Sequence, residues 1–266
     1  MPELPDVEIF KRYLDSYGLD KTIKEVEIRS EKVLRDLQPE EFKSALAGNK
    51  FGSSQRHGKH LFVYTSGEEW LGFHFGMTGF FEYLSPGEGP EGHPRVLFHY
   101  DDESCMVYDC QRKLGEINLV EDKDNFIARK NLGPDALKEV DRDKFEVIIS
   151  NSRAMAKSTL MNQEKIAGIG NIYSDEILFQ AGINPRAKAS NLSQARIEDL
   201  YHKMNYVLSE AIACEVETER MPPNFLLPHR TPGTSCPQCG VNIERVKVSG
   251  RSAYFCPSCQ SISNSG

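Results

Sequence analysis

The sequence has no long hydrophobic run and no basic N-terminal segment. No stretch approaches the roughly 18 consecutive apolar residues that a membrane-spanning helix requires, and residues 1–6 contain neither Lys nor Arg. We therefore expect a cytoplasmic protein without a membrane span or secretion signal. Internal repeats and low-complexity tracts are also lacking. With 266 residues and 39% hydrophobic content, the chain can form two modest soluble domains.

An excess of positive charge is lacking as well. The formal net charge of -7 disfavours a protein that coats nucleic acid indiscriminately, because such binding depends on cations that displace the counterions of phosphates. The charge is unevenly distributed, however. Residues 225–266 contain a single acidic residue, Glu244, and the following basic residues: Arg230, Arg245, Lys247 and Arg251. The end of the chain is therefore a candidate phosphate-binding region.

Four of the seven cysteines form two C-x2-C pairs in this basic region. Their spacing is typical of a four-thiolate zinc site, and four protein ligands leave no open position for catalysis. We therefore predict one structural Zn²⁺, with these ligands: Cys236, Cys239, Cys256 and Cys259. Alternating residues at 243–248 and 253–255 predict a β-hairpin between the pairs, which would present Lys247 and Arg251. We interpret the other three cysteines as packing residues: Cys105, Cys110 and Cys214.

The hydrophobic pattern changes once along the chain. Residues 3–17 have helical spacing, residues 22–30 alternate as a strand, and residues 50–120 form short β-rich runs that predict a β-sandwich or barrel. After a boundary near residue 134, four helical patterns follow, at 141–150, 157–165, 171–180 and 193–214. Prolines at 222–232 predict an extended linker into the cysteine-bearing region.

A glycine-containing turn precedes the helix predicted from residue 171. The segment Gly168-Ile169-Gly170-Asn171 would point backbone N–H groups outward at the start of that helix, which is a ready phosphate site. Asn171 could cap the helix or donate directly to a phosphate, and Arg153 and Lys157 would add positive charge. A plain packing joint between two helices explains the turn equally well.

The N-terminal residues offer a possible reagent. Removal of Met1 would leave Pro2 with a free secondary amine beside the carboxylate of Glu3. Such an amine attacks an aldehyde-level carbon to give a cationic iminium, which acts as an electron sink. At C1′ of a deoxyribose, this would permit elimination of the 3′ phosphate while a carboxylic acid protonates the ring oxygen. The Met-Pro-Glu sequence by itself is incidental in most proteins.

Several motifs in order extend over the whole chain. They are residues 2–8 (PELPDVE), 57–59 (HGK), 74–79 (HFGMTG), 132–134 (LGP), 168–173 (GIGNIY) and the four cysteines. With them, the sequence resembles the formamidopyrimidine-DNA glycosylase / endonuclease VIII family, and more closely its formamidopyrimidine branch. The resemblance implies an α+β fold: an N-terminal helix and β-sandwich domain (1–134), a helix–two-turn–helix domain (135–224) and a β-hairpin zinc finger (225–266).

The resemblance also implies roles for individual residues. Pro2 matches the Schiff-base nucleophile and Glu3 the proton donor, while Lys59 matches a hairpin lysine that assists β-elimination. Arg251 matches a finger arginine that acts in δ-elimination and binds phosphate. Met77, Arg112 and Leu114 match the side chains that fill the gap left by an extracted nucleotide. The other implied DNA contacts are His74, His93, Lys157 and Asn171, although packing against the sheet explains His74 equally well. Arg153 is added as a DNA contact because it lies near the glycine turn.

The sequence departs from the family pattern at three places. Asp6 stands where the formamidopyrimidine branch usually has Glu. The segment 109–115 is one residue longer than usual, and Leu114 replaces a Phe, which weakens stacking on the orphaned base. The segment 214–223 is shorter than the Gly-rich stretch that covers a flipped 8-oxoguanine in that branch. We therefore expect weaker specificity for 8-oxoguanine.

The expected function is a bifunctional DNA glycosylase and AP lyase of base excision repair. It would excise oxidised purines from duplex DNA, namely formamidopyrimidines, further-oxidised guanine and, with weaker specificity, 8-oxoguanine. It would also cleave the strand at abasic sites by β,δ-elimination. The resemblance implies a monomer that is cytoplasmic, and nucleoid-associated in a prokaryote. Alternatives are an oxidised-pyrimidine glycosylase of endonuclease VIII type, a non-catalytic damaged-DNA binding protein, and a zinc-ribbon module with unrelated chemistry. Intact Pro2, Glu3 and Lys59 favour an enzyme.

Overall fold

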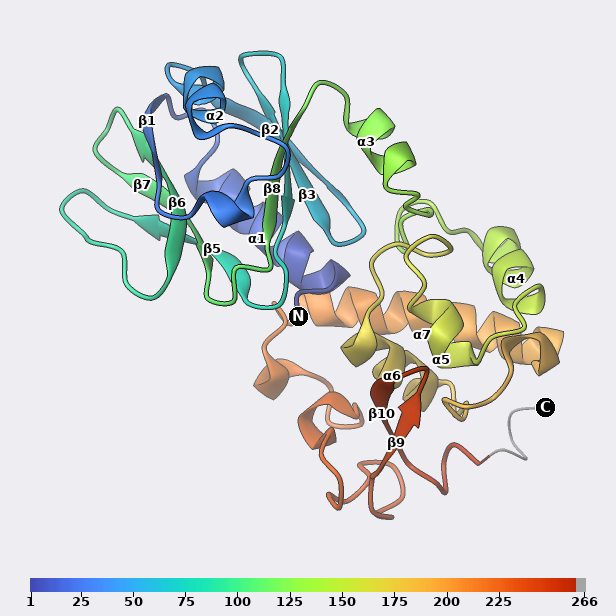
Figure 1. The fold of residues 1–266 in the computed structure, drawn as a ribbon. Coiled ribbons are helices and arrows are strands. Elements are labelled where there is room, and N and C mark those ends of the chain that lie inside the picture. Colours follow the sequence, from blue (N-terminus) through green and yellow to red (C-terminus); the bar gives the residue numbers. More distant parts are fainter. Residues whose placement is uncertain (262–266) are drawn as a thin grey trace. The chain divides into compact units, whose positions relative to one another are not determined.

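The computed structural model describes residues 1–261, which separate into two compact units (Figure 1). The first unit comprises Met1–Pro2 and Asp6–Lys130, and the second comprises Glu3–Pro5 and the chain from Asn131 onward. No helix in the described range is both long and apolar enough to cross a membrane. The finer division at residues 134 and 224 stays a prediction.

The first unit contains two antiparallel four-stranded sheets, ordered β1-β6-β7-β5 and β2-β3-β4-β8. The strands are β1 (Ile23–Ile28), β2 (Phe51–His57), β3 (His60–Thr65), β4 (Trp70–His74), β5 (Gly79–Leu84), β6 (Pro94–Tyr100), β7 (Cys105–Cys110) and β8 (Glu116–Val120). The helices are α1 (Leu4–Tyr17), η1 (Glu31–Val33), α2 (Pro39–Leu46) and α3 (Lys123–Arg129).

Both sheets of the first unit share one hydrophobic core. Val26 of β1 and Phe98 of β6 lie in the same buried cluster as Leu61 of β3 and Phe73 of β4, together with Leu14 of α1. The inward-facing side chains of two sheets thus pack on each other, which is the arrangement of a β-sandwich. The predicted N-terminal helix and sandwich are confirmed.

The second unit is mostly helical. Its elements are α4 (Arg142–Ser150), α5 (Ala156–Leu160), α6 (Asn171–Gln180), η2 (Ala189–Asn191), α7 (Gln194–Ala213), η3 (Thr218–Arg220), η4 (Leu227–His229), β9 (Glu244–Val248) and β10 (Arg251–Phe255). The long helix α7 packs against α4 and α6 around a core that includes Leu160, Ile177 and Leu208. The β9–β10 hairpin confirms the predicted hairpin between the cysteine pairs, and β10 lies along α6 (Figure 1).

Two sequence predictions in this unit are wrong in detail. The helix predicted over 157–165 ends at Leu160, because side chains replace the helical hydrogen bonds beyond it: Asn162 Oδ1 accepts from Glu164 N (2.9 Å), and Gln163 Nε2 donates to Ile169 O (2.7 Å). The linker predicted as extended at 222–232 is compact instead. It contains η4, and its Phe225 and Leu226 are fully buried.

Candidate functional site

Two adjacent loops of the first unit bring together the three side chains predicted to fill a gap in DNA. Met77 lies between β4 and β5, and Arg112 and Leu114 lie between β7 and β8. The Arg112 guanidinium donates to Met77 Sδ (2.9 Å), and Arg112 N donates to Thr78 Oγ1 (3.2 Å). Met77 is 40% and Leu114 47% exposed, although both are apolar. Exposed apolar tips on linked loops are suited to insertion between bases.

Glycine is required where these loops meet. Gly76 has φ +59°, and a Cβ at this position would lie 2.5 Å from the backbone carbonyl of Leu114. Its N–H donates to His74 Nδ1 (3.3 Å), which needs a neutral imidazole. Burial lowers the pKa of His74, so the neutral form is favoured. His74 thus supports the Met77 loop, while its predicted contact with DNA stays a prediction.

His93 and an arginine that sequence reasoning missed hold the second loop. The exposed His93 precedes β6, and its backbone N–H donates to the Asp109 carboxylate. Arg95 donates to Cys110 O at the end of β7 (2.8 Å) and to Gln111 O in the loop (3.1 Å). Arg95 therefore fixes the residue next to Arg112.

Lys59 lies at the tip of the tight β2–β3 hairpin, in which His57 pairs with His60. Arg56 braces this tip. Its Nε donates to Glu8 Oε2 on α1 (2.8 Å), and its Nη1 donates to Gly58 O (3.3 Å). The Arg56 side chain is only 1% exposed, so the ion pair is shielded from water. Glu8 therefore helps to place the lysine-bearing turn.

The carboxylate of Glu3 occupies the N-terminus of α6. Oε2 accepts from Gly170 N (2.6 Å) and Tyr173 N (3.2 Å), and Oε1 accepts from Ile172 N (2.8 Å). These are N–H groups without partners inside the helix, and the helix dipole adds to their attraction for an anion. The prediction that the glycine turn offers them to a phosphate is therefore wrong, since Glu3 itself takes these three. Gly170 is the N-cap, so Asn171 is not the cap either.

We expect Gly170→Ala to destabilise the protein by about 3 kcal/mol, because overpacking and lost hydrogen bonds combine. An added Cβ would lie 2.3 Å from Glu3 Cδ and 2.4 Å from Oε1, and Glu3 is only 1% exposed. Urea denaturation measures the change. Gly89→Ala is the matched control, since its Cβ would meet nothing within 4 Å. Equal stabilities of the two variants would contradict the tight fit around Glu3.

Lys157 does not face solvent, which corrects its predicted role as a phosphate contact. Its side chain is 0% exposed, and Nζ donates to Asp175 Oδ1 (2.5 Å), Asn171 O (3.0 Å) and Ser174 Oγ (3.0 Å). All three partners lie on α6. Burial lowers the pKa of Lys157 against the attraction of Asp175. The lysine thus fastens α5 to the first turn of α6.

Three other predicted DNA contacts lie in the second unit. Arg153 is exposed before α5, and Asn171 is half-buried at the start of α6. Arg251 is exposed at the start of β10, beside a shallow pocket that Ser158 and Ser249 also line. The two serine hydroxyls lie 2.7 Å apart, so they hold the hairpin turn on α5.

The four predicted zinc ligands converge on one point. Their sulfur atoms all lie within 4.8 Å of one another, with Cys236 and Cys259 Sγ 3.9 Å apart and Cys239 and Cys256 Sγ 3.4 Å apart. A tetrahedral site with Zn–S bonds of about 2.3 Å separates its sulfurs by about 3.8 Å. The residues therefore fit one Zn²⁺ with four thiolate ligands.

Known families match nearly the whole chain. Residues 1–117 match the formamidopyrimidine-DNA glycosylase N-terminal domain, and residues 132–222 match the formamidopyrimidine-DNA glycosylase H2TH domain. The chain belongs to the formamidopyrimidine-DNA glycosylase family. Residues 235–262 match the zinc finger found in FPG and IleRS, and together with the sulfur geometry this establishes one structural zinc.

Relatives and solved structures in this family agree. The chain is 36% identical to a formamidopyrimidine-DNA glycosylase of Solibacter usitatus (98% of this chain, 99% of the relative). It is 31% identical to that of Mycoplasma mobile (98% and 100%). The Lactococcus lactis FPG in complex with a FAPY-dG containing DNA superposes with TM-score 0.88 (26% identity, 97% and 100%). MutM in complex with carbocyclic 8-oxo-G containing DNA gives 0.89 at 26% identity (98% and 100%).

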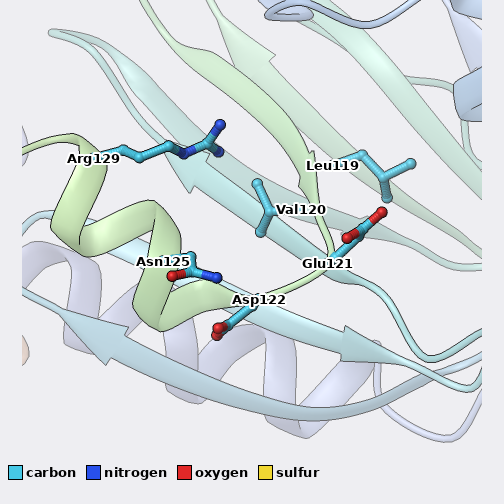
Figure 2. A pocket seen from close by; sticks show the side chains of 6 residues that line it. All are labelled: Leu119, Val120, Glu121, Asp122, Asn125 and Arg129. Atoms are coloured by element: carbon cyan, nitrogen blue, oxygen red, sulfur yellow. The ribbon is translucent and has the colours of Figure 1, made fainter.

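A separate pocket in the first unit contains none of the predicted site residues. Figure 2 shows it at the end of β8 and along α3, with these lining residues: Leu119, Val120, Glu121, Asp122, Asn125 and Arg129. Asp122 Oδ1 accepts from Asp124 N (2.9 Å) and so caps α3. The carboxylates of Glu121 and Asp122 outnumber the one cation, Arg129, so the net charge of the lining disfavours a phosphate.

The positioning residues are those that sequence reasoning missed. Arg56, Arg95 and Arg230 each bind a backbone carbonyl or a carboxylate far away in the sequence. Arg56 and Arg95 had no predicted role, and Arg230 was expected only as part of the basic region 225–266, whereas in the structure it binds Asp175. The only available signal is the basic residue adjoining a motif, as for Arg56 before His57-Gly58-Lys59. Their partners become visible only in the fold.

Proposed function

We propose that the protein is a bifunctional glycosylase and AP lyase of base excision repair that acts on oxidised purines in duplex DNA. Family membership supports the enzyme class, and the named relatives are formamidopyrimidine-DNA glycosylases. The observation that carries the proposal is the Glu3 carboxylate, which follows Pro2 directly in the chain and is held by three N–H groups at the N-terminus of α6, including that of the N-cap Gly170. A nucleophile and an acid adjoin each other at the N-terminus. A binding protein has no need of this pair.

In the proposed reaction, the Pro2 amine attacks C1′ of the damaged nucleotide. The bond between C1′ and the base breaks, and the base leaves with its electron pair and takes up the proton that the Pro2 amine loses. Glu3 protonates the ring oxygen, so the sugar opens to an iminium. Loss of a C2′ proton then expels the 3′ phosphate, and loss of the C4′ proton expels the 5′ phosphate. Water hydrolyses the remaining iminium, which releases the sugar remnant and frees the Pro2 amine. Lys59 assists the first elimination and Arg251 the second, which leaves a gap with phosphate at both ends.

We propose that formamidopyrimidines and further-oxidised guanine are preferred over 8-oxoguanine. The segment 214–223 is folded on itself: Val216 N donates to Ala211 O (2.8 Å), and Arg220 pairs with Glu215. Glu176 holds the residues that follow, because its carboxylate accepts from Leu226 N (3.1 Å) and Leu227 N (2.7 Å). So compact a segment leaves little chain to cover a flipped base. Oxidised pyrimidines are the second candidate substrates. Excision rates on a panel of single-lesion duplexes distinguish the two classes of substrate.

Borohydride trapping tests the covalent step. After Met1 removal is verified by mass spectrometry, incubation with abasic-site duplex and borohydride should give a stable adduct, because the iminium is reduced to an amine. The control is the same protein with two residues added before Pro2, which keeps the fold and removes the free secondary amine. An adduct with the extended protein, or none with the processed one, would contradict the Pro2 assignment.

We also infer that the protein acts as a monomer on chromosomal DNA in the cytoplasm or nucleoid. A base excision substrate is duplex DNA, and the chain itself supplies the nucleophile, acid and phosphate contacts of the proposed reaction. Fluorescence microscopy of a C-terminally tagged protein should show it over the DNA. Exclusion from the DNA-containing region would contradict the location.

A further inference from the structure

Arg230 lies at a junction of the second unit that the proposed reaction does not use. It follows η4, and its guanidinium binds Asp175 Oδ2 through Nε (3.0 Å) and Nη2 (2.8 Å). The same group lies 4.4 Å from the ring centroid of Tyr254 on β10. Its Nη2 also donates to Asn171 O (3.4 Å). The Arg230 side chain is only 17% exposed, so this group is engaged within the protein.

Asp175 joins Arg230 to three segments. Oδ1 accepts from Lys157 on α5, and Oδ2 accepts from Tyr254 N on β10 (3.2 Å) in addition to Arg230. Asp175 itself lies on α6, one turn after Asn171. A single buried carboxylate therefore connects the start of α6 with the strand that begins at Arg251.

The charges indicate which partner can be removed without unfolding the protein. Asp175 and Lys157 are both 0% exposed, so they balance each other when Arg230 is absent. Removal of Asp175 would instead leave Lys157 and Arg230 near each other without the carboxylate that binds both, at a large cost. Among Lys157, Asp175 and Arg230, the arginine is thus not needed to neutralise Asp175. Its contribution is the contacts that it makes with α6 and β10.

We propose that Arg230 is a positioning residue for DNA binding, which sets Asn171 and the finger residue Arg251 relative to each other through Asp175 and Tyr254. Arg230 contacts the Asn171 carbonyl directly. It contacts the finger by stacking on Tyr254, three residues after Arg251 in β10. A planar, bidentate guanidinium can do both at once, whereas a lysine ammonium cannot. The proposal rests on the proposed function, in which Arg251 binds a DNA phosphate.

The test is a double-mutant cycle on binding to an abasic-analogue duplex at several salt concentrations. Arg251→Ala should weaken binding about tenfold and lower the salt slope by about 0.9, the value for one lost phosphate contact. Arg230→Met should do the same, because it misplaces Arg251. The double variant should then be no weaker than either single variant. Arg230→Lys should recover only part of the affinity.

Controls separate this role from a general structural one. Zinc content and melting temperature are measured for every variant. Arg142→Met is the matched control, since it removes an equal charge from an exposed ion pair with Glu198 in the same unit. Arg230→Met with normal affinity and salt slope, or effects of Arg230→Met and Arg251→Ala that multiply, would overturn the proposal. If the wild-type protein itself fails to bind the duplex, the proposed function fails instead.

Discussion

Glu3→Gln should reduce removal of an oxidised purine by about 10²- to 10⁴-fold, the usual contribution of a positioned acid. Glutamine has the shape of glutamate but no carboxylic proton to transfer. Cleavage of a pre-formed abasic site should persist, because no base has to leave there and Pro2 can attack the aldehyde form of the sugar directly. The two activities of one variant therefore separate the acid from the nucleophile.

The geometry around Glu3 predicts a moderate loss of stability in the same variant. The amide oxygen can still accept from Gly170 and Tyr173, but the NH₂ group would face the N–H of Ile172, which Glu3 Oε1 now satisfies. One lost hydrogen bond and one unsatisfied donor cost about 1–3 kcal/mol. The variant should thus be folded at 25 °C and melt at a lower temperature.

Three measurements decide this prediction: excision of a formamidopyrimidine lesion, borohydride trapping on abasic DNA, and thermal melting. Glu164→Gln is the matched control. This glutamate is exposed in the turn before α6, and its substitution removes the same charge. Excision by Glu3→Gln at the wild-type rate would exclude Glu3 as the proton donor. Loss of trapping together with excision would show that Glu3 instead orients Pro2.

The sequence predicted most of the regular elements but not how buried charges are used. The β-sandwich, α4, α6, α7 and the zinc hairpin followed from hydrophobic patterns and cysteine spacing. The role of the glycine turn did not. Nothing local shows that Glu3, far away in the chain, fills the N–H groups that a phosphate could otherwise bind.

Lys157 is a second buried charge whose role the sequence did not predict. A lysine beside a predicted phosphate site is normally exposed, so the sequence favoured a DNA contact. In the fold it is buried because Asp175 and two oxygen atoms of α6 satisfy its ammonium. Such a pairing depends on how α5 meets α6. Tertiary contact, and not residue type, decides whether a charge binds substrate or fastens the fold.

Cys239→Ala should abolish zinc binding and weaken DNA binding at least about 100-fold. Structural zinc contributes roughly 10–16 kcal/mol to the folding of small fingers, and loss of one thiolate of four removes most of it. The finger has little core of its own: Ile243, Cys236 and Cys256 pack with Leu226 and Phe179. Without the metal, the hairpin that carries Arg251 should unfold.

The rest of the protein should survive this change, which makes the result interpretable. The first unit has a separate core of both sheets and α1, and the helices of the second unit share another around α7. Metal content by a colorimetric zinc assay, circular dichroism and binding to an abasic-analogue duplex are therefore measured on the same sample. Cys214→Ala is the matched control, since this half-buried thiol lies outside the four-sulfur cluster.

Zinc loss should act through the hairpin and not through the catalytic terminus. At protein concentrations high enough to saturate the weakened DNA binding, Cys239→Ala should still form the borohydride adduct, because in the proposed reaction the finger supplies no group for the attack of Pro2 on C1′. Unfolding of the hairpin should displace Arg251. The rate of the second elimination, which Arg251 assists, should therefore fall more than the rate of the first. A variant without zinc that binds DNA as tightly as wild type would show that the finger contributes no phosphate contact. Complete loss of the adduct at saturation would show that the metal also maintains the N-terminal nucleophile.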